Sequence, residues 1–223
     1  MKIGIIGNGK MGQLISTLAE KRGHKIVFRS NSSNPIDNFE LREIDIAIDF
    51  STPKSAYKNI SHAINNGIPT ISGTTGWLDK IQDIQNLCNK KNGSFLHSSN
   101  FSIGMNLFFE LNKKLSTLIK SYNYDITIHE KHHKNKLDIP SGTAIKLSND
   151  INNISNNEVN IKSTRMNDII GEHSIMCESL NDKIEIKHIA KNRKDFAFGA
   201  IIAAEWLINK KGVFGMTDVL KGL

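Results

Sequence analysis

The fold is decided by the first twelve residues, MKIGIIGNGKMG (residues 1–12). A short β-rich run is followed at once by glycines with the spacing G-x-G-x-x-G and by an apolar repeat at helical spacing. In a strand–turn–helix unit, Gly7 permits the tight turn, Gly9 lets a pyrophosphate approach the backbone, and Gly12 lets the helix pack on the strand. The helix N-terminus adds amide donors and a positive partial charge. These residues predict a dinucleotide site, with a glycine turn that binds nothing as the alternative.

Strand and helix signals then alternate through the first half of the chain. Strands are expected at residues 25–28, 45–50, 68–72 and 95–97, with helices over residues 53–65 and 77–90. Pro53 follows Ser51 and Thr52, which is typical of a helix start, and Gly67 is typical of a helix end. This order predicts an α/β fold with an N-terminal Rossmann-like, doubly wound parallel sheet and helices on both of its faces.

After Ile103 the pattern changes. A long helix (103–121), a strand (124–129) and a second long helix after Pro140 precede an Asn-rich loop (152–160) and two alternating strands, Glu172–Glu178 and Lys183–Ile189. We predict a second, α+β domain with an open mixed or antiparallel sheet and helices on one face. An apolar helix over residues 196–209 should pack back on the first domain. The expected domains are residues 1–102, completed by a C-terminal helix within 196–223, and residues 103–195.

Composition narrows the class of protein. Apolar residues make up 39% and charged residues 23% of the 223 residues, and no run approaches the roughly 18 apolar residues of a membrane span. The first residues lack a signal-peptide core, so a cytoplasmic protein is expected. Cys88 and Cys177 match no metal or redox spacing, which favours buried thiols in a reducing compartment.

The formal net charge of +7 could indicate an acidic partner. The basic residues are scattered along the chain, and aromatic residues are only 7%, which is a poor supply of stacking surfaces for single-stranded nucleic acid. We therefore expect neither nucleic-acid nor membrane binding, and an acidic small molecule is favoured instead.

The end of the second expected strand bears on which dinucleotide binds. An acidic side chain there would hold the ribose hydroxyls of NAD, but Arg29 and Ser30 occupy the position. The planar guanidinium of Arg29 can pair with a 2′-phosphate, so NADP is favoured over NAD. The alternative is that Arg29 is a solvated loop residue.

Two further loops follow strands of the same expected sheet, Ser72-Gly73-Thr74-Thr75-Gly76 and Ser98-Ser99-Asn100-Phe101-Ser102. Loops at the carboxyl ends of parallel strands line the ligand crevice of such sheets. Their small residues would let a nicotinamide ring approach, and Asn100 could bond its carboxamide. Ordinary turn chemistry is the alternative for each loop.

The densest group of titratable residues is HEKHHKNKLDIPSGT, residues 129–143. Its first five residues fit the zinc-protease pattern H-E-x-x-H, which requires a helix to place both imidazoles on one face. The preceding DITI alternates with β-branched residues and indicates a strand, on which side chains four apart are about 13 Å apart. We therefore predict no metal.

As a strand that runs into a loop, the same segment offers acid–base chemistry. His132 can titrate near neutral pH, and Lys136 can donate a proton and attract anions. Ser141-Gly142-Thr143 opens the second long helix, whose amides form an anion site. Together these groups suit a small dianionic substrate, whereas the alternative is a solvated basic loop.

These motifs resemble one family along the whole chain, the 4-hydroxy-tetrahydrodipicolinate (dihydrodipicolinate) reductases of the diaminopimelate–lysine pathway. The resemblance is carried, in order, by residues 7–12, 49–53, 73–76, 100–106, 130–143, 171–173 and 184–188. The run from His132 and His133 through Lys136 and Asp138 to residues 140–143 is specific to the family, whereas a glycine fingerprint alone is not.

The resemblance implies hydride delivery from NADPH or NADH to C4 of a cyclic substrate, with loss of water from its 4-hydroxy form. It implies His132 as general acid/base, Lys136 as proton donor, and His133, Gly142 and Thr143 as the groups that hold the substrate carboxylates. It further implies a homotetramer joined through the sheet of the second domain, and no metal. The implied cofactor-binding residues, to which the strand-end argument adds Arg29, are Gly7, Asn8, Gly9, Lys10, Met11, Gly12, Gly73, Thr74, Thr75, Ser98, Ser99, Asn100 and Phe101.

Two other classes of protein remain as alternatives. One is another two-domain dehydrogenase, acting on an aspartate-derived aldehyde or amino acid; the basic segment and the lack of a plausible cysteine nucleophile argue against the aldehyde enzyme. The other is a non-catalytic dinucleotide sensor, which would keep the glycine loop but need not keep the basic segment that is intact here.

Overall fold

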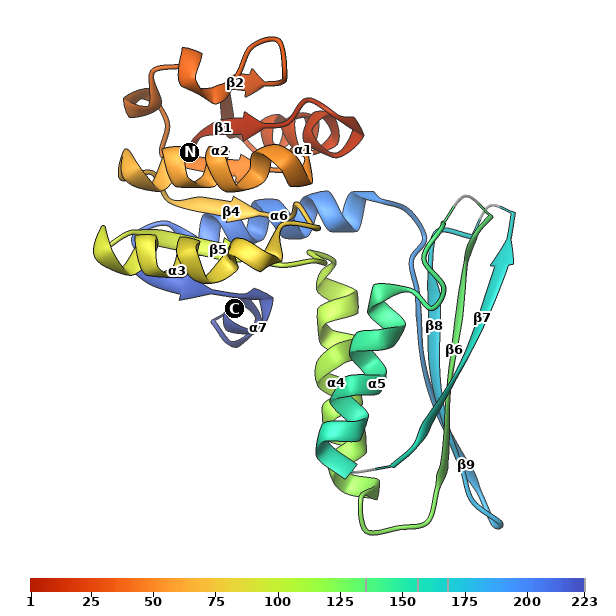
Figure 1. The fold of residues 1–223 in the computed structure, drawn as a ribbon. Coiled ribbons are helices and arrows are strands. Elements are labelled where there is room, and N and C mark those ends of the chain that lie inside the picture. The colour runs from red at the N-terminus through yellow and green to blue at the C-terminus, as the bar shows by residue number, and fades with distance from the viewer. Residues whose placement is uncertain (135, 156, 168, 223) are drawn as a thin grey trace. The chain divides into compact units, whose positions relative to one another are not determined.

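The computed structural model describes residues 1–134, 136–155, 157–167 and 169–222 (Figure 1). The chain divides into two compact units. Unit 1 comprises Met1–Ile103 and Lys194–Leu223, and unit 2 comprises Gly104–Arg193. Within the described ranges, no helix is both long and apolar enough to cross a membrane.

Unit 1 is built on a parallel sheet with the strand order β10-β5-β4-β3-β1-β2. Its strands are β1 Lys2–Ile6, β2 Lys25–Ser30, β3 Ile46–Asp49, β4 Thr70–Ser72, β5 Ser94–His97 and β10 Gly212–Phe214. Its helices are α1 Lys10–Lys21, α2 Pro53–Asn65, α3 Ile81–Lys90, α6 Lys194–Leu207 and α7 Met216–Lys221, and short 3-10 turns lie at Ile36–Asn38, Leu41–Glu43 and Leu78–Lys80. The predicted doubly wound sheet is confirmed.

Helices cover both faces of this sheet because both faces are apolar. Ile3 and Ile5 of β1 point into a core that includes residues of α1 and α6, whereas Ile6 points to the opposite face, into a core shared with Ala63 of α2. Each isoleucine is at most 1% exposed, and full burial of such a side chain is worth about 1.5–3 kcal/mol. The alternation of β1 across the sheet therefore fixes which helices lie on which side.

The C-terminal segment differs from the single helix predicted within residues 196–223. Helix α6 ends at Leu207. Asn209 and Gly212 then adopt left-handed backbone angles, with φ of 65° and 126°, and β10 and α7 follow. Strand β10 pairs in parallel with β5 and so extends the sheet by one strand. The break occurs because the two left-handed residues turn the chain back onto the sheet edge.

Unit 2 is a four-stranded mixed sheet with the order β7-β6-β8-β9. Strand β6 is parallel to β7 and antiparallel to β8, which is antiparallel to β9. Both long helices pack on one face of this sheet (Figure 1), as predicted, and their core includes Phe108, Ile128 and Leu147. The elements are α4 Ile103–Ile119, β6 Asp125–His133, α5 Gly142–Ser155, β7 Val159–Met166, β8 Glu172–Glu178 and β9 Lys183–Ile189.

Two expectations for unit 2 are corrected. Strand β6 continues four residues beyond the predicted end at residue 129, because β7 and β8 hydrogen-bond to it on both sides. Most of the segment 152–160 is not a loop: α5 continues to Ser155 and β7 starts at Val159, which leaves residues 157 and 158 as irregular chain, while Asn156 lies outside the described residues. Both corrections change the site. The extension of β6 carries His132, and the unpredicted strand β7 carries further residues of the site.

Candidate functional site

In unit 1, the carboxyl ends of β1, β2 and β3 surround a cavity of about 570 Å³. It lies where the strand order reverses, with β2 on one side of β1 and β3 on the other, which is where open α/β sheets bind ligands. A second cavity, of about 350 Å³, shares Gly9, Phe50 and Ser51 with the first. The predicted Gly7, Asn8 and Gly9 line the first cavity, and Gly9, Lys10, Met11, Gly73, Thr74 and Thr75 line the second.

The three glycines of the first loop each meet a different steric demand. Gly7 has a φ of 103°, and a Cβ on it would lie 2.2 Å from the Phe50 carbonyl oxygen. A Cβ on Gly12 would lie 1.9 Å from the Gly7 carbonyl oxygen, so only glycine lets α1 approach the turn this closely. At Gly9, by contrast, nothing lies within 4 Å of an added Cβ. This open space at the N-terminus of α1 fits the approach of a phosphate.

A buried carboxylate joins the loops after β3 and β4. Asp49 is 0% exposed, and its Oδ2 accepts hydrogen bonds of 2.8 Å from both the Ser72 and Thr74 hydroxyls. The Thr74 hydroxyl in turn accepts a 2.9 Å bond from the Ser51 amide. Burial raises the pKa of Asp49 although these hydroxyls oppose the shift. The buried Asp49 carboxylate therefore sets the distance between the two loops.

Arg29 does not line either of these cavities. Its Nε donates to the Ser16 hydroxyl at 2.9 Å, and its Nη2 lies 3.6 Å from the Glu20 carboxylate on α1. Alternation along β2 explains this, because Phe28 and Ser30 are buried on one side of the strand while Arg29 between them points to the other.

The cavity wall near β2 is polar and carries no acidic side chain. Ser30, Asn31 and Ser32 form it together with Lys58 of α2, whose ammonium contacts Asp37 at 2.7 Å. Sequence reasoning missed Lys58 because it lies far along the chain from the strand end that it faces.

The loop after β5 is organised by its own side chains. The Ser98 hydroxyl donates to the Asn100 carbonyl at 2.7 Å, and the Asn100 side-chain oxygen accepts from the Ser102 amide at 2.9 Å. Phe101 is 2% exposed and packs on Phe50, with ring centroids 5.7 Å apart. Neither cavity described above includes residues 98–101 in its lining.

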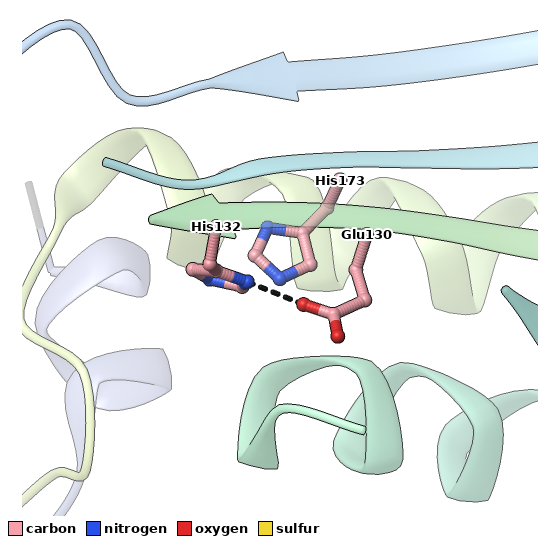
Figure 2. Close-up of side chains that lie close together, drawn as sticks. All are labelled: Glu130, His132 and His173. Carbon is pink, nitrogen blue, oxygen red and sulfur yellow. Dashed lines mark hydrogen bonds and ion pairs between the residues drawn. The ribbon is translucent and has the colours of Figure 1, made fainter. Parts of the chain in front are cut away.

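In unit 2, three titratable side chains meet on the helix-covered face of the sheet (Figure 2). Glu130 and His132 are two residues apart on β6 and therefore share a face, and His173 stands opposite Glu130 on β8. Nδ1 of His132 is hydrogen-bonded to Oε2 of Glu130, and the rings of His132 and His173 lie 5.0 Å apart at 73°. All three residues are buried, Glu130 completely.

Electrostatics set the protonation of this pair. Burial raises the pKa of Glu130, but the Ser163 hydroxyl, the Arg165 guanidinium and the charge of His132 outweigh it, so that the pKa is lowered overall. An ionised carboxylate only accepts hydrogen bonds, so this bond fits a neutral His132 with its proton on Nδ1 and its lone pair on Nε2. Burial also lowers the pKa of His132, against the attraction of Glu130.

Space beside Nε2 of His132 is kept by a glycine. A Cβ on Gly171 would lie 3.3 Å from Nε2, so a larger side chain there would crowd the nitrogen that carries the lone pair. Gly171 belongs to the sequence motif 171–173, and this contact gives a physical reason for the glycine.

Arg165 of β7 joins this pair to the segment that carries Lys136. Its Nη1 donates to Oε1 of Glu130 at 2.9 Å, and its Nη2 donates to the Asp138 carbonyl at 2.6 Å. The Asp138 carboxylate contacts the Lys136 ammonium at 2.9 Å and accepts from the Gly142 amide at 3.3 Å. Lys136 therefore holds a carboxylate together with the N-terminus of α5. Asn135, between these residues in sequence, lies outside the described residues.

The remaining predicted substrate residues lie in two places. Thr143 is half-buried in the first turn of α5, next to Gly142. His133 follows His132 on β6 and therefore projects to the opposite face of the sheet. It lines a cavity of about 640 Å³ with Lys134, Asn192 and Arg193. The structure thus does not bring His133 into the group around His132.

The strand assignment that argues against an H-E-x-x-H zinc site is confirmed, because residues 125–133 form β6. Glu130, His132 and His173 nevertheless offer ligand atoms within 4.8 Å of one another. Both oxygens of Glu130 are already engaged, one by His132 and one by the positively charged Arg165. This arrangement fits a proton-sharing pair better than a metal centre, which is why we keep the prediction that no metal is used.

Together, the two units define a class of protein. A doubly wound sheet with a glycine-lined turn at a helix N-terminus, together with a second unit that holds a buried His–Glu pair, is the arrangement expected of a two-domain, nicotinamide-dependent oxidoreductase.

Comparisons with known proteins identify the family within this class. Residues 1–101 match the family profile described as dihydrodipicolinate reductase, N-terminus, and residues 104–220 match the profile for the C-terminus. A 4-hydroxy-tetrahydrodipicolinate reductase from Christiangramia forsetii is 44% identical over 100% of this chain and 99% of its own length. One from Thermosipho africanus is 37% identical over 99% and 98%. The dipicolinate-bound dihydrodipicolinate reductase from Paenisporosarcina sp. TG-14 has the same fold, with a TM-score of 0.79, 22% identity and 98% coverage of both chains.

The chain therefore belongs to the dihydrodipicolinate reductase family. Its activity is that of a 4-hydroxy-tetrahydrodipicolinate reductase of lysine biosynthesis, and the family uses NADH or NADPH. The resemblance inferred from the sequence is confirmed, and the alternatives of another dehydrogenase or a non-catalytic sensor are set aside.

We expect the buried His173 to make unit 2 sensitive to acid. Burial lowers its pKa from 6.5 to about 3, so the unfolded chain binds a proton there that the folded chain does not. The contribution of neutral His173 to the free energy of unfolding is complete above pH 6.5. Between pH 6.5 and about pH 3 it falls by up to about 1.4 kcal/mol per pH unit. Urea unfolding followed by circular dichroism between pH 7 and pH 4 should show a shallower pH dependence for His173→Gln than for the wild type. Parallel pH curves for the two proteins would contradict the assignment.

Proposed function

We propose that unit 1 binds NADPH or NADH and that unit 2 binds and protonates 4-hydroxy-tetrahydrodipicolinate. When bound, the reduced nicotinamide supplies the hydride that goes to C4 of the substrate. The C4 hydroxyl leaves as water after it takes a proton, and the products are tetrahydrodipicolinate, water and the oxidised cofactor. The observation that carries this proposal is the buried pair of His132 and Glu130, with Lys136 near the same imidazole.

His132 is the proposed general acid/base. The bond from Nδ1 to Glu130 orients the ring and leaves Nε2 to exchange a proton with the substrate or with water. A carboxylate behind an imidazole fixes its tautomer and stabilises the imidazolium form when that forms, as in hydrolase triads. The space beside Nε2 kept by Gly171 supports this role.

Lys136 is the proposed proton donor, and it binds the dicarboxylate together with Gly142 and Thr143. His133, which the resemblance implies as a further carboxylate ligand, projects to the opposite face of β6 and is not part of this proposed group. The Asp138 carboxylate, held between the Lys136 ammonium and the Gly142 amide, indicates that a carboxylate fits these donors. A substrate carboxylate would take its place at the positive end of α5. The dipicolinate bound by the Paenisporosarcina reductase is a planar dicarboxylate, which supports this ligand class.

The proposed cofactor site follows the carboxyl ends of the strands in unit 1. Gly9 leaves open space for the pyrophosphate, residues 7–11 and 73–75 line the two cavities, and Gly12 lets α1 pack against the turn. Ser98, Ser99 and Asn100 would lie beside the nicotinamide through their backbone and small polar side chains, and Phe101 would hold this loop by packing on Phe50. NADPH is favoured because the wall of the first cavity near β2 offers hydroxyls and Lys58, whose ammonium is paired with Asp37, and its lining residues include no acidic side chain.

We further propose that four copies associate through the face of the unit 2 sheet that α4 and α5 leave open. On this face Glu172 lies between Lys131, at 3.2 Å, and Lys187, at 2.8 Å, and Ser174 and Met176 follow along β8. Ion pairs that span three strands give a rigid, self-complementary surface of the kind that symmetric assemblies use.

We expect substitutions of His132 and Lys136 to slow the chemical step. His132→Gln and Lys136→Ala should each lower kcat by about 10²–10⁴-fold, because each removes a positioned proton-transfer group. The rate is followed by the loss of reduced nicotinamide, with substrate made in situ by the preceding synthase. His62→Gln and Lys120→Ala, which replace the same residue types outside the proposed proton-transfer groups, serve as controls. Wild-type kcat in both site variants would overturn the assignment.

We expect the 2′-phosphate of NADPH to be held by a cation at the β2 end. The ratio of kcat/KM for NADPH to that for NADH should fall about 10–100-fold when that cation is lost, as for a charge-assisted hydrogen bond. Arg29→Ala and Lys58→Ala are to be compared. A fall only in Lys58→Ala would assign the phosphate contact to Lys58, and unchanged ratios in both variants would refute the preference for NADPH.

The assembly is tested by light scattering on the purified chain. A homotetramer of 24.9 kDa chains has a mass of about 100 kDa. Met176→Lys should lower that mass, because it places a charge on the open sheet face. A wild-type mass of a single chain would refute the tetramer.

A further inference from the structure

We propose that Arg165 is a positioning residue of the reductase reaction, which orients His132 through Glu130 and holds the segment of Lys136 through the Asp138 main chain. This inference rests on the proposed roles of His132 and Lys136. Sequence reasoning did not predict strand β7, so Arg165 has no role in the function derived so far.

Arg165 is the cation that pairs with the buried carboxylate of Glu130. In the parallel pairing of β6 and β7, Arg165 stands beside His132, and Ser163 stands beside Glu130. Glu130 is completely buried, and the Arg165 side chain is 13% exposed. A carboxylate with so little contact to water stays ionised only if a cation is paired with it. Arg165 supplies that charge at 2.9 Å and so allows His132 to remain neutral, with its proton on Nδ1.

The guanidinium of Arg165 also reaches the segment that carries Lys136. While Nη1 contacts Glu130, Nη2 donates to the Asp138 carbonyl at 2.6 Å. Asp138 in turn contacts the Lys136 ammonium and the Gly142 amide. One planar side chain thus bridges the proposed acid–base residue and the proposed proton donor, which lie on different segments.

Arginine is required for this bridge and lysine is not equivalent. The guanidinium presents several N–H donors in a fixed fork, so it can bond two acceptors in different directions, whereas an ammonium is a compact point charge on a flexible stem. Lysine at this position would keep the charge beside Glu130 but lose the fixed bond to Asp138. The two parts of the role can therefore be separated by substitution.

The charged and titratable groups around His132 predict how the pH of its proton uptake changes when Arg165 is replaced. If the guanidinium is removed, Glu130 and His132 are left to share an additional proton, and the pair takes it up at higher pH than in the wild type. This direction holds whichever of the two carries the proton. The other such groups are Lys136 in the segment after β6, His173 on β8, and His188, which stands opposite His173 on β9.

The test compares Arg165→Met and Arg165→Lys with the wild type, with kcat, both KM values and the pH dependence of kcat/KM as readouts. Arg165→Met should lower kcat about 10–100-fold, the usual loss when a group that orients a functional histidine is removed. Its acidic pH limb should move to higher pH, and the KM for NADPH should stay within about twofold because the cofactor cavities lie in unit 1. Arg165→Lys should keep the wild-type pH limb but retain a lowered kcat.

The control is Arg22→Met, which removes a bidentate arginine–carboxylate pair with Glu205 in unit 1 and should leave kcat and the pH limb unchanged. Wild-type kcat and an unmoved limb in Arg165→Met would overturn the inference. If Arg165→Met does not fold, Arg165→Lys decides alone: a lowered kcat with an unmoved limb supports the bridge, and a wild-type kcat overturns it.

His132→Gln in the same assay distinguishes a failure of the proposed function from a failure of the role proposed for Arg165. A wild-type rate in His132→Gln would refute the proposed function itself. A slow His132→Gln together with a normal Arg165→Met would refute only the role of Arg165. In the double variant, the loss caused by Arg165→Met should shrink, because the residue acts through His132.

Discussion

A carboxylate that is buried completely inside unit 2 is the constraint on which the site depends. Glu130 lies on the central strand β6, between β7 and β8, and it reaches no solvent. A buried charge is tolerated only when it is paired, and the loss of one partner from such a pair costs about 3–5 kcal/mol. Its two partners, His132 and Arg165, are therefore fixed by the same requirement that keeps the unit folded. Stability and chemistry depend on the same few contacts.

Unit 1 meets a different constraint, which is steric. The turn after β1 must bring α1 against the sheet and still leave its N-terminus open, and glycine at positions 7, 9 and 12 satisfies both conditions. Buried Asp49 then fixes the loops after β3 and β4, because its carboxylate accepts hydrogen bonds from the Ser72 and Thr74 hydroxyls. Both units follow one logic, in which a rigid sheet interior places polar groups at a strand end where a ligand can reach them.

The sequence predicted what its periodicity makes visible. The glycine fingerprint, the doubly wound order and the alternating strands Glu172–Glu178 and Lys183–Ile189 all agree with the structure. Strand β7 was missed because Ser163 and Arg165 occupy positions on its helix-covered face. These polar residues interrupt the alternation of apolar and polar residues by which a strand is recognised in a sequence. The end of β6 was missed for the same reason.

Other features depend on partners that are distant in sequence. Alternation along β2 sets Arg29 opposite Phe28 and Ser30, but which side faces the cavity depends on the pairing of β2 with β1, whose register has an irregularity between Ile3 and Gly4 of β1 that no sequence pattern marks. The pairing of Arg165 with Glu130 joins residues 35 positions apart. By contrast, the sharing of one face by Glu130 and His132 follows from the period of two and could have been found.

The central claim is that Glu130 is ionised and holds the proton of His132 on Nδ1. Heteronuclear NMR of the imidazole nitrogens tests this most directly, with the His132→Gln spectrum used to assign the signal. At neutral pH we predict a neutral ring with the proton on Nδ1 and a lone pair on Nε2. A neutral ring with its proton on Nε2, or a ring protonated on both nitrogens at neutral pH, would contradict the account.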